Sequence, residues 1–217
     1  METITGLLRR YPHVWWALFL PVYLALFFLM EAVVPTEGYW ATQLPIDHQI
    51  PFLEGFVVFY AAWAPVLVAV GLWLLIKDGE NFKYYMWTLA ITFIASTVFC
   101  LLVPNGQDLR PEVLPRDNIF CALVGLIYSL DTNTNVFPSV HVVGVMAVLF
   151  AMWHTDTARK WRIPALILGI LIILSTLFIR QHAVLDVLAS LVLSAVSYAI
   201  VYGFLARRGK GGLHGTR

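Results

Sequence analysis

Six apolar stretches dominate this 217-residue sequence. Each has about the length that an α-helix needs to cross a hydrocarbon layer of roughly 30 Å. Unpaired backbone polar groups are too costly in lipid, so each stretch is expected to be helical. The sequence therefore predicts an all-α integral membrane protein, a six-transmembrane-helix bundle forming one domain over 1–217. The predicted spans are 14–34, 52–76, 84–103, 136–153, 163–179 and 184–205.

The composition supports lipid as the solvent. Hydrophobic residues make up 60% of the chain and charged residues only 12%, whereas a soluble domain carries about a quarter charged residues. A net charge of +1 gives no reason to expect a nucleic-acid partner. Cys100 and Cys121 match no metal-ligand or disulfide spacing, so they are predicted to be buried thiols. The first apolar stretch is too long for a signal peptide and lacks a cleavage site, which predicts a retained anchor.

The distribution of cationic residues predicts the orientation. With the N-terminus in the cytoplasm, only Arg110, Arg116 and Arg180 of the 14 Lys and Arg lie outside. Cytoplasmic loops of membrane proteins are enriched in these residues. Both termini are therefore expected in the cytoplasm, and the favoured location is the bacterial plasma membrane.

The long segment 104–135 is predicted to lie on the outer side. Within it, residues 118–130 are apolar at helical spacing but too short to cross the membrane. This pattern predicts a helix lying at the outer interface. A seventh span there would place Arg159, Lys160 and Arg162 outside, against the charge bias, and we reject it.

Unusual polar residues collect at the outer ends of the predicted spans. His182 and Asp186 stand at the start of the sixth span, four residues apart and therefore on one helical face. Asp186 can accept the Nδ1 proton of His182 and leave Nε2 free as a nucleophile or base. The competing interpretation is a hydrogen-bonded pair that only joins spans.

Two further groups lie on the same predicted side. Ser139 and His141 begin the fourth span, where free amide groups bind anions and a histidine can protonate a leaving group. The competing interpretation there is a capped helix start with an interfacial histidine. Arg110 and Arg180 carry guanidinium groups that suit phosphate oxygens. These two arginines would otherwise contact lipid headgroups or nearby carboxylates.

Taken together, these residues favour phosphoryl transfer through a covalent phosphohistidine without a metal. The sequence PSVH at 138–141, followed by HAVLD at 182–186, resembles the second and third signature motifs of the type 2 phosphatidic acid phosphatase (PAP2) superfamily. The motif order, the separation of about 40 residues and the six spans are also similar. The sequence PNGQDLRP at 104–111 resembles a degenerate first motif.

The resemblance implies a role for each matching residue. His182 would be the nucleophile, Asp186 would orient it, and His141 would protonate the leaving group. The resemblance also implies a set of phosphate-binding residues, namely Ser139, Arg110, Arg180, Asn105 and Gln107.

Two positions depart from the family pattern. Val103 stands where the first motif has lysine, and Asn105 or Gln107 is expected to compensate. Thr176 stands where the third motif has arginine, and Arg180 is expected to compensate. This variant resembles the branch that includes bacterial lipid phosphatases and the inositol-phosphorylceramide and sphingomyelin synthases.

The expected function is hydrolysis of a lipid phosphomonoester or pyrophosphate through a phosphohistidine intermediate on the non-cytoplasmic face, with no cofactor and no metal. A phosphotransferase that moves a phospho-headgroup between lipids is a close second hypothesis. Two more distant hypotheses are a non-catalytic lipid-binding or transport protein, and a zinc site made by His141, His182 and Asp186.

The remaining histidines are predicted to be uninvolved, with one exception. His13 and His154 lie at the cytoplasmic ends of spans and His214 in the polar tail, whereas His48 lies outside and could approach the site. Several aromatic residues are predicted to form belts at the membrane interfaces. They are Trp15, Trp16, Trp40, Tyr84, Tyr85 and Trp87.

Overall fold

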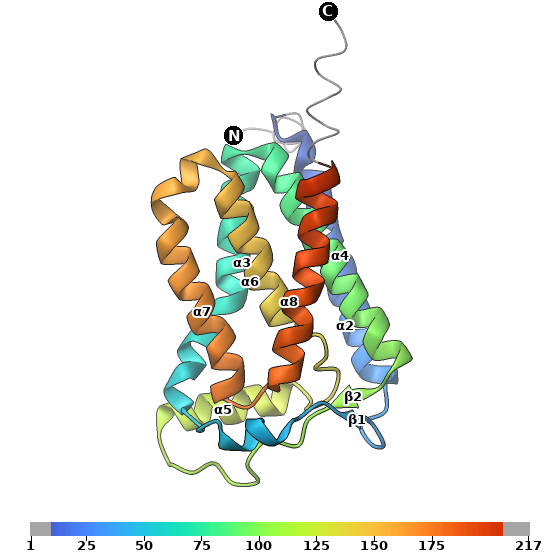
Figure 1. Cartoon of the computed structure of the whole chain (residues 1–217), viewed down its shortest axis with the longest axis vertical. Helices are drawn as coiled ribbons and strands as arrows, with labels where there is room; N and C mark the ends of the chain where they lie inside the picture. The colour runs from blue at the N-terminus through green and yellow to red at the C-terminus, as the bar shows by residue number, and fades with distance from the viewer. Residues whose placement is uncertain (1–9, 206–217) are drawn as a thin grey trace, which may run out of the picture.

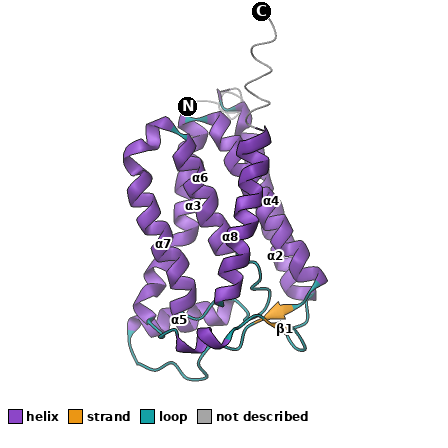
Figure 2. Cartoon of the chain, viewed as in Figure 1, coloured by secondary structure: helices purple, strands orange, loops and turns teal. Residues whose placement is uncertain are grey.

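The computed structural model describes residues 10–205, which form a bundle of helices (Figure 1). Most of the described chain is helical, as the secondary-structure colouring in Figure 2 shows. The predicted all-α architecture is therefore confirmed. The helices that run along the bundle are α2 (Phe19–Val33), α3 (Val57–Lys77), α4 (Gly79–Leu102), α6 (Val140–His154), α7 (Arg162–Phe178) and α8 (Val184–Tyr198).

Short 3-10 and π segments extend several of these helices. They are η1 (Pro12–Leu18) before α2, η3 (Glu54–Phe56) before α3, η4 (Asp156–Trp161) before α7, and η5 (Ala199–Leu205) after α8. A further segment, η2 (Pro45–Gln49), lies in a loop. With these extensions, five helices within residues 10–205 are long and apolar enough to cross a membrane. They are Pro12–Val33, Glu54–Lys77, Gly79–Leu102, Asp156–Phe178 and Val184–Leu205.

The helix α6 is shorter than the predicted fourth span. It starts at Val140, because Ser139 caps it and accepts a hydrogen bond from the amide of Val142 at 3.4 Å. Most of its residues are buried, since α3, α4, α7 and α8 pack around it. A central helix of 15 residues is shielded by protein on its sides, so its length is not matched to lipid.

The helix α5 (Ile119–Leu130) lies across one end of the bundle (Figure 1). It begins after the N-cap Asn118, whose side chain accepts the amide hydrogen of Cys121 at 2.9 Å. The predicted short helix over 118–130 is thus confirmed. We call this end of the molecule the loop end.

A two-residue parallel ribbon also lies at the loop end. It consists of β1 (Trp40–Ala41) and β2 (Asn105–Gly106), with Trp40 opposite Asn105. The start of η1 and the end of η5 lie at the opposite end of the bundle (Figure 1). The ribbon joins the loop between α2 and η2 to the long loop between α4 and α5.

Three side chains test simple expectations about burial. Tyr85 is buried and donates its hydroxyl hydrogen to the carbonyl of Leu67 at 3.1 Å, so its predicted place in an interfacial belt is wrong. The reason is its position on the inner face of α4. Cys100 and Cys121 are both buried and free, as predicted.

Candidate active site

The structure brings His141, His182 and Asp186 together at the loop end of the bundle. Nε2 of His182 lies 3.3 Å from Nδ1 of His141. On its other side, Nδ1 of His182 lies 3.4 Å from Oδ2 of Asp186. Asp186 is fully buried and His182 is only 7% exposed. A buried carboxylate therefore stands behind an imidazole that faces a second imidazole, the arrangement that nucleophilic catalysis requires.

The turn between α7 and α8 sets the position of His182. The carbonyl of Thr176 accepts the amide hydrogens of both Gln181 and His182, at 2.9 and 3.1 Å. Arg180 adopts a left-handed conformation with φ of 53°, which is unusual for a residue with a side chain. The chain thereby folds back on the end of α7 and presents His182 just before α8 begins.

Two carboxylates cap the start of α8. Oδ2 of Asp186 accepts the amide hydrogen of Ala183 at 2.8 Å. Oδ1 of Asp47, from the distant segment η2, accepts the amide hydrogen of Val184 at 2.7 Å. Negative charge is favourable at a helix N-terminus, where amide groups lack partners. Asp47 is buried and was not identified from the sequence.

Replacing Asp47 by alanine is expected to lower both stability and turnover. The amides of Leu44 and Val184 each lose an acceptor, and each unpaired buried amide costs about 1–3 kcal/mol. The melting temperature should fall by several degrees, roughly 3–10 °C, and kcat by about 10-fold because α8 loosens beside His182. Calorimetry and steady-state kinetics measure both. Asp108→Ala, which removes an exposed carboxylate on the same face, is the control and should change little.

The start of α6 places Ser139 beside the histidines. Its hydroxyl oxygen serves as the helix cap, and its carbonyl accepts a hydrogen bond from the Ser190 hydroxyl of α8 at 3.2 Å. Ser139 is fully buried. This contact ties the first turn of α6 to the first turns of α8, the helix starts beside which His141 and His182 lie.

Arg110 lies in the loop before α5, and its guanidinium reaches the carbonyl groups just after the C-terminal end of that helix. Its guanidinium donates to the carbonyls of Asp131 at 2.8 Å and Thr132 at 2.6 Å and to Oε1 of Gln181. The guanidinium also lies over the ring of Tyr128, with 4.5 Å between the guanidinium carbon and the ring centroid. Nε of Arg110 is buried and has no hydrogen-bond partner within residues 10–205. The Nε hydrogen of Arg110 is therefore available to bind a ligand.

Burial shapes the electrostatics around Arg110. Desolvation lowers the pKa of its guanidinium, and the Asp131 carboxylate opposes that shift. Desolvation raises the pKa of Asp131, and Arg110 is the strongest opposing influence. The Arg110 guanidinium and the Asp131 carboxylate therefore each favour the charged form of the other in an environment with little water.

Gln181 was missed by the sequence analysis. Its side-chain oxygen is held by Arg110, and its amide nitrogen, Nε2, is buried with no hydrogen-bond partner in the described part of the chain. It directly precedes His182. A lone glutamine beside a histidine carries no distinctive sequence signal, so only the fold reveals it.

Arg180 binds the loops around the site. Its guanidinium donates to the carbonyls of Leu109 at 3.1 Å and Ile50 at 3.2 Å. Its own carbonyl accepts a hydrogen bond from the Gln107 side chain at 2.9 Å. Arg180 therefore links both long loops to the turn that carries His182.

Asn105 and Gln107 are buried, and their side chains bind backbone groups. Asn105 accepts the amide hydrogen of Phe137 at 2.9 Å and donates to the carbonyl of Val103 at 2.8 Å. The side-chain oxygen of Gln107 accepts the amide hydrogen of Leu109 at 2.6 Å. Both side-chain amides therefore hold the first-motif loop in shape.

Two aromatic rings of α3 contact His141. The ring centroid of Tyr60 lies 4.5 Å from that of His141, and the centroid of Trp63 lies 4.4 Å from it. Neither residue was singled out from the sequence, because aromatic residues within an apolar helix are common in membrane proteins. They form one wall of the site.

The remaining histidines lie away from this cluster. His48 is exposed on η2. His13 and His154 contact the backbone carbonyls of Leu75 and Phe150 near the opposite end of the bundle. His214 lies outside the described residues.

The zinc hypothesis requires three or four gathered ligands. Among residues 10–205, no three His, Cys, Asp or Glu side chains are placed to hold a metal ion together. Around His182 the structure places the His141 ring at 3.3 Å on one side and the Asp186 carboxylate at 3.4 Å on the other.

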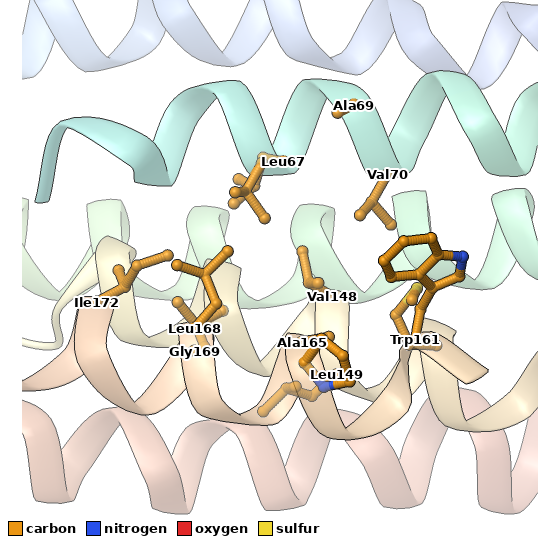
Figure 3. A pocket seen from close by; sticks show the side chains of 14 residues that line it. Leu67, Ala69, Val70, Val148, Leu149, Trp161, Ala165, Leu168, Gly169 and Ile172 are labelled. Atoms are coloured by element: carbon orange, nitrogen blue, oxygen red, sulfur yellow. The ribbon is translucent and has the colours of Figure 1, made fainter. Parts of the chain in front are cut away.

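Two apolar grooves flank α3 and contain none of the three clustered residues. One, of about 330 Å³, lies between α3, α6 and α7 and is drawn in Figure 3. The second, of about 580 Å³, lies between α2, α3 and α4 and includes Trp63. Both grooves are lined almost entirely by apolar atoms, so they suit the hydrocarbon chains of lipids and lack the polar groups of a catalytic site.

Comparison with known proteins identifies what this chain resembles. The family model of the PAP2 superfamily matches residues 81–210, which is more than half of the chain. The chain is also 29% identical, over 164 residues, to undecaprenyl-diphosphatase BcrC of Bacillus subtilis (strain 168). That match covers 74% of this chain and 76% of the relative. No solved structure matches the chain significantly.

Proposed function

The chain belongs to the PAP2 superfamily, and on this premise we propose that it is a metal-independent lipid phosphatase that acts on a polyprenyl diphosphate or a related lipid phosphate. The family membership and the likeness to an undecaprenyl-diphosphatase support the reaction class. The single observation that carries the mechanism is the row of Asp186, His182 and His141, with contacts of 3.4 and 3.3 Å.

In the proposed reaction, Nε2 of His182 attacks phosphorus and a phosphohistidine forms. The bond between phosphorus and the leaving oxygen breaks, and His141 delivers a proton to that oxygen. Asp186 holds the Nδ1 hydrogen of His182 and stabilises the positive charge on its ring. Water, deprotonated by His141, then attacks phosphorus and releases inorganic phosphate with His182 restored.

The rings of His141 and His182 must separate when substrate binds. A nucleophile approaches phosphorus at about 3–3.5 Å, and the acid needs a further 2.6–3.2 Å, roughly, to reach the leaving oxygen. The observed separation of 3.3 Å accommodates a single hydrogen. The proposal therefore includes a small movement of His141, or of the turn before α8.

Phosphate binding is proposed to use buried donors that lack partners. Nε of Arg110 and Nε2 of Gln181 are such donors, and both flank the turn that carries His182. The free amides at the start of α6, after Ser139, supply further donors and the positive end of a helix dipole. Arg180, Asn105 and Gln107 are proposed to hold the surrounding loops, since their polar groups bind backbone.

The loop end is proposed to face away from the cytoplasm, as it carries Arg110, Arg116 and Arg180 and few other cations. The positive-inside rule then places the opposite end, with the remaining Lys and Arg, in the cytoplasm. A lipid phosphate of the outer leaflet would reach His182 from this side.

The proposed function is tested with the purified protein in detergent and excess chelator. Phosphate release is measured from a polyprenyl diphosphate, the corresponding monophosphate and phosphatidate. We expect release to persist in chelator and kcat/KM to be highest for the diphosphate. Activity that disappears with chelator and returns with zinc would contradict the metal-independent mechanism. Headgroup transfer to an added lipid alcohol, without phosphate release, would identify a phosphotransferase instead.

A further inference from the structure

We infer that Tyr60 and Trp63 are positioning residues that hold the imidazole of His141 in the orientation and the protonated form that a general acid needs. The inference rests on the proposed function, which gives His141 that role. It concerns two residues of α3 that lie outside the signature motifs.

The first observation is the geometry of the three rings. Tyr60 and Trp63 are three residues apart on α3, so they lie on one face of that helix. Their ring centroids lie 4.5 and 4.4 Å from that of His141, at interplanar angles of 30° and 43°. Both distances fall within the roughly 6 Å over which a cation is attracted to an aromatic ring.

The second observation is the absence of a side chain at Gly144. A Cβ added at this position would lie 2.8 Å from Nε1 of Trp63, closer than any ordinary contact. Gly144 follows His141 by three residues on α6, so the imidazole and the space for the indole share one helical face. The close approach of Trp63 to α6 therefore depends on glycine at this position.

The physical consequence concerns the charge on His141. A protonated imidazole is attracted to the negative faces of Tyr60 and Trp63, whereas the neutral ring gains much less. Each contact should favour the protonated form by roughly 2- to 30-fold. Among ionisable groups, His182 contacts His141 directly and Asp186 contacts His182. Asp131 and Arg110 interact electrostatically with Tyr60, and none of these four residues is changed in the variants below.

The test uses the leaving group as the readout. An alkyl phosphate, such as a short polyprenyl monophosphate, needs a proton on its departing oxygen. An aryl phosphate, such as 4-nitrophenyl phosphate, departs as a stable anion and needs none. The rate measured is that of phosphoenzyme formation, because His141 also deprotonates water in the second step of the proposed reaction. A variant that damages the general acid slows phosphoenzyme formation from the alkyl substrate and leaves it unchanged from the aryl substrate. A packing defect lowers both.

The variants are Trp63→Leu, Trp63→Phe and Gly144→Ala, with His141→Ala as the reference for loss of the acid. Trp63→Leu and Gly144→Ala should lower the rate of phosphoenzyme formation from the alkyl phosphate by about 3- to 30-fold, with KM within about threefold. Trp63→Phe keeps an aromatic face and should retain most activity. Trp73→Leu, about 15 Å further along α3, is the matched control and should leave the ratio of the two rates unchanged.

The outcomes separate this inference from the proposed function. A selective loss on the alkyl phosphate in His141→Ala, Trp63→Leu and Gly144→Ala supports both. A selective loss in His141→Ala, with equal losses on the two substrates in Trp63→Leu and Gly144→Ala, overturns the role of Trp63 and keeps the acid. Equal losses in His141→Ala overturn the acid role and the inference together. If Trp63→Leu does not fold, the result for Gly144→Ala decides between these outcomes, because this substitution leaves Tyr60, Trp63 and His141 themselves unchanged.

Discussion

Replacing His182 by alanine is expected to lower phosphate release by about 10⁴- to 10⁶-fold, the loss seen when a covalent nucleophile is removed. The reason is that Nε2 of His182, 3.3 Å from His141, is the atom placed to attack phosphorus beside the general acid. Rapid quench into alkaline detergent with a ³²P-labelled substrate should trap a phosphoenzyme in the wild type. That species is labile to acid and stable to base, as expected for a phosphoramidate, and it should be absent from the variant.

The matched control for this experiment is His48→Ala. His48 is exposed on η2, at the same loop end as His182. Its replacement should leave kcat within about twofold, the change typical of exposed sites. A His182→Ala protein that still accumulates labelled phosphoenzyme would place the covalent bond on another residue and end the proposed mechanism.

Replacing Asp186 by asparagine is expected to lower kcat by about 10³- to 10⁴-fold, as loss of the orienting carboxylate does in serine-protease triads. The amide oxygen can still accept the hydrogen of the Ala183 amide, so α8 keeps its cap. That oxygen occupies the place of Oδ2, which also faces Nδ1 of His182, so the substitution keeps the contact and removes the negative charge. The positive charge that develops on the attacking ring would therefore lose its counter-charge.

Kinetics and stability together test the Asp186 prediction. Burst measurements should show slower formation of the phosphoenzyme, and calorimetry should show a melting temperature near that of the wild type. A parallel collapse of stability would mean that Asp186 acts mainly as a helix cap. Asp47→Asn provides the comparison, because Asp47 caps the same helix from η2, through the amide of Val184.

The helical framework was predictable because long apolar stretches admit few structures in lipid. Even α5 was predictable, since its apolar residues recur at helical spacing after Asn118. The meeting of His141, His182 and Asp186 was also predictable. These residues lie at the starts of α6 and α8. Successive spans cross the bundle in opposite directions, so the starts of these two helices lie at the same end.

The supporting residues could not be predicted, because each depends on a distant partner. Asp47 caps α8 across 137 residues of sequence, and Gln181 meets Arg110 across 71. Arg180 is close to His182 in sequence and was expected to bind phosphate. In the structure, the left-handed turn at this residue gives its guanidinium backbone acceptors at Ile50 and Leu109, and its contact with phosphate stays a prediction. Such loop contacts leave no periodic signal in the sequence.

The short distance between the two imidazoles has a consequence for the proposed mechanism. The 3.3 Å contact has room for one hydrogen between the facing nitrogens. In this mechanism, the lone pair of the nucleophile is therefore masked at rest by the ring that later donates the proton. Reagents too small to push the rings apart find no exposed nucleophile. A bulky phosphate that enters between His141 and His182 uncovers the lone pair and leaves the hydrogen on the group that must transfer it. The lipid thereby activates the residue that cleaves it, and an empty site stays unreactive.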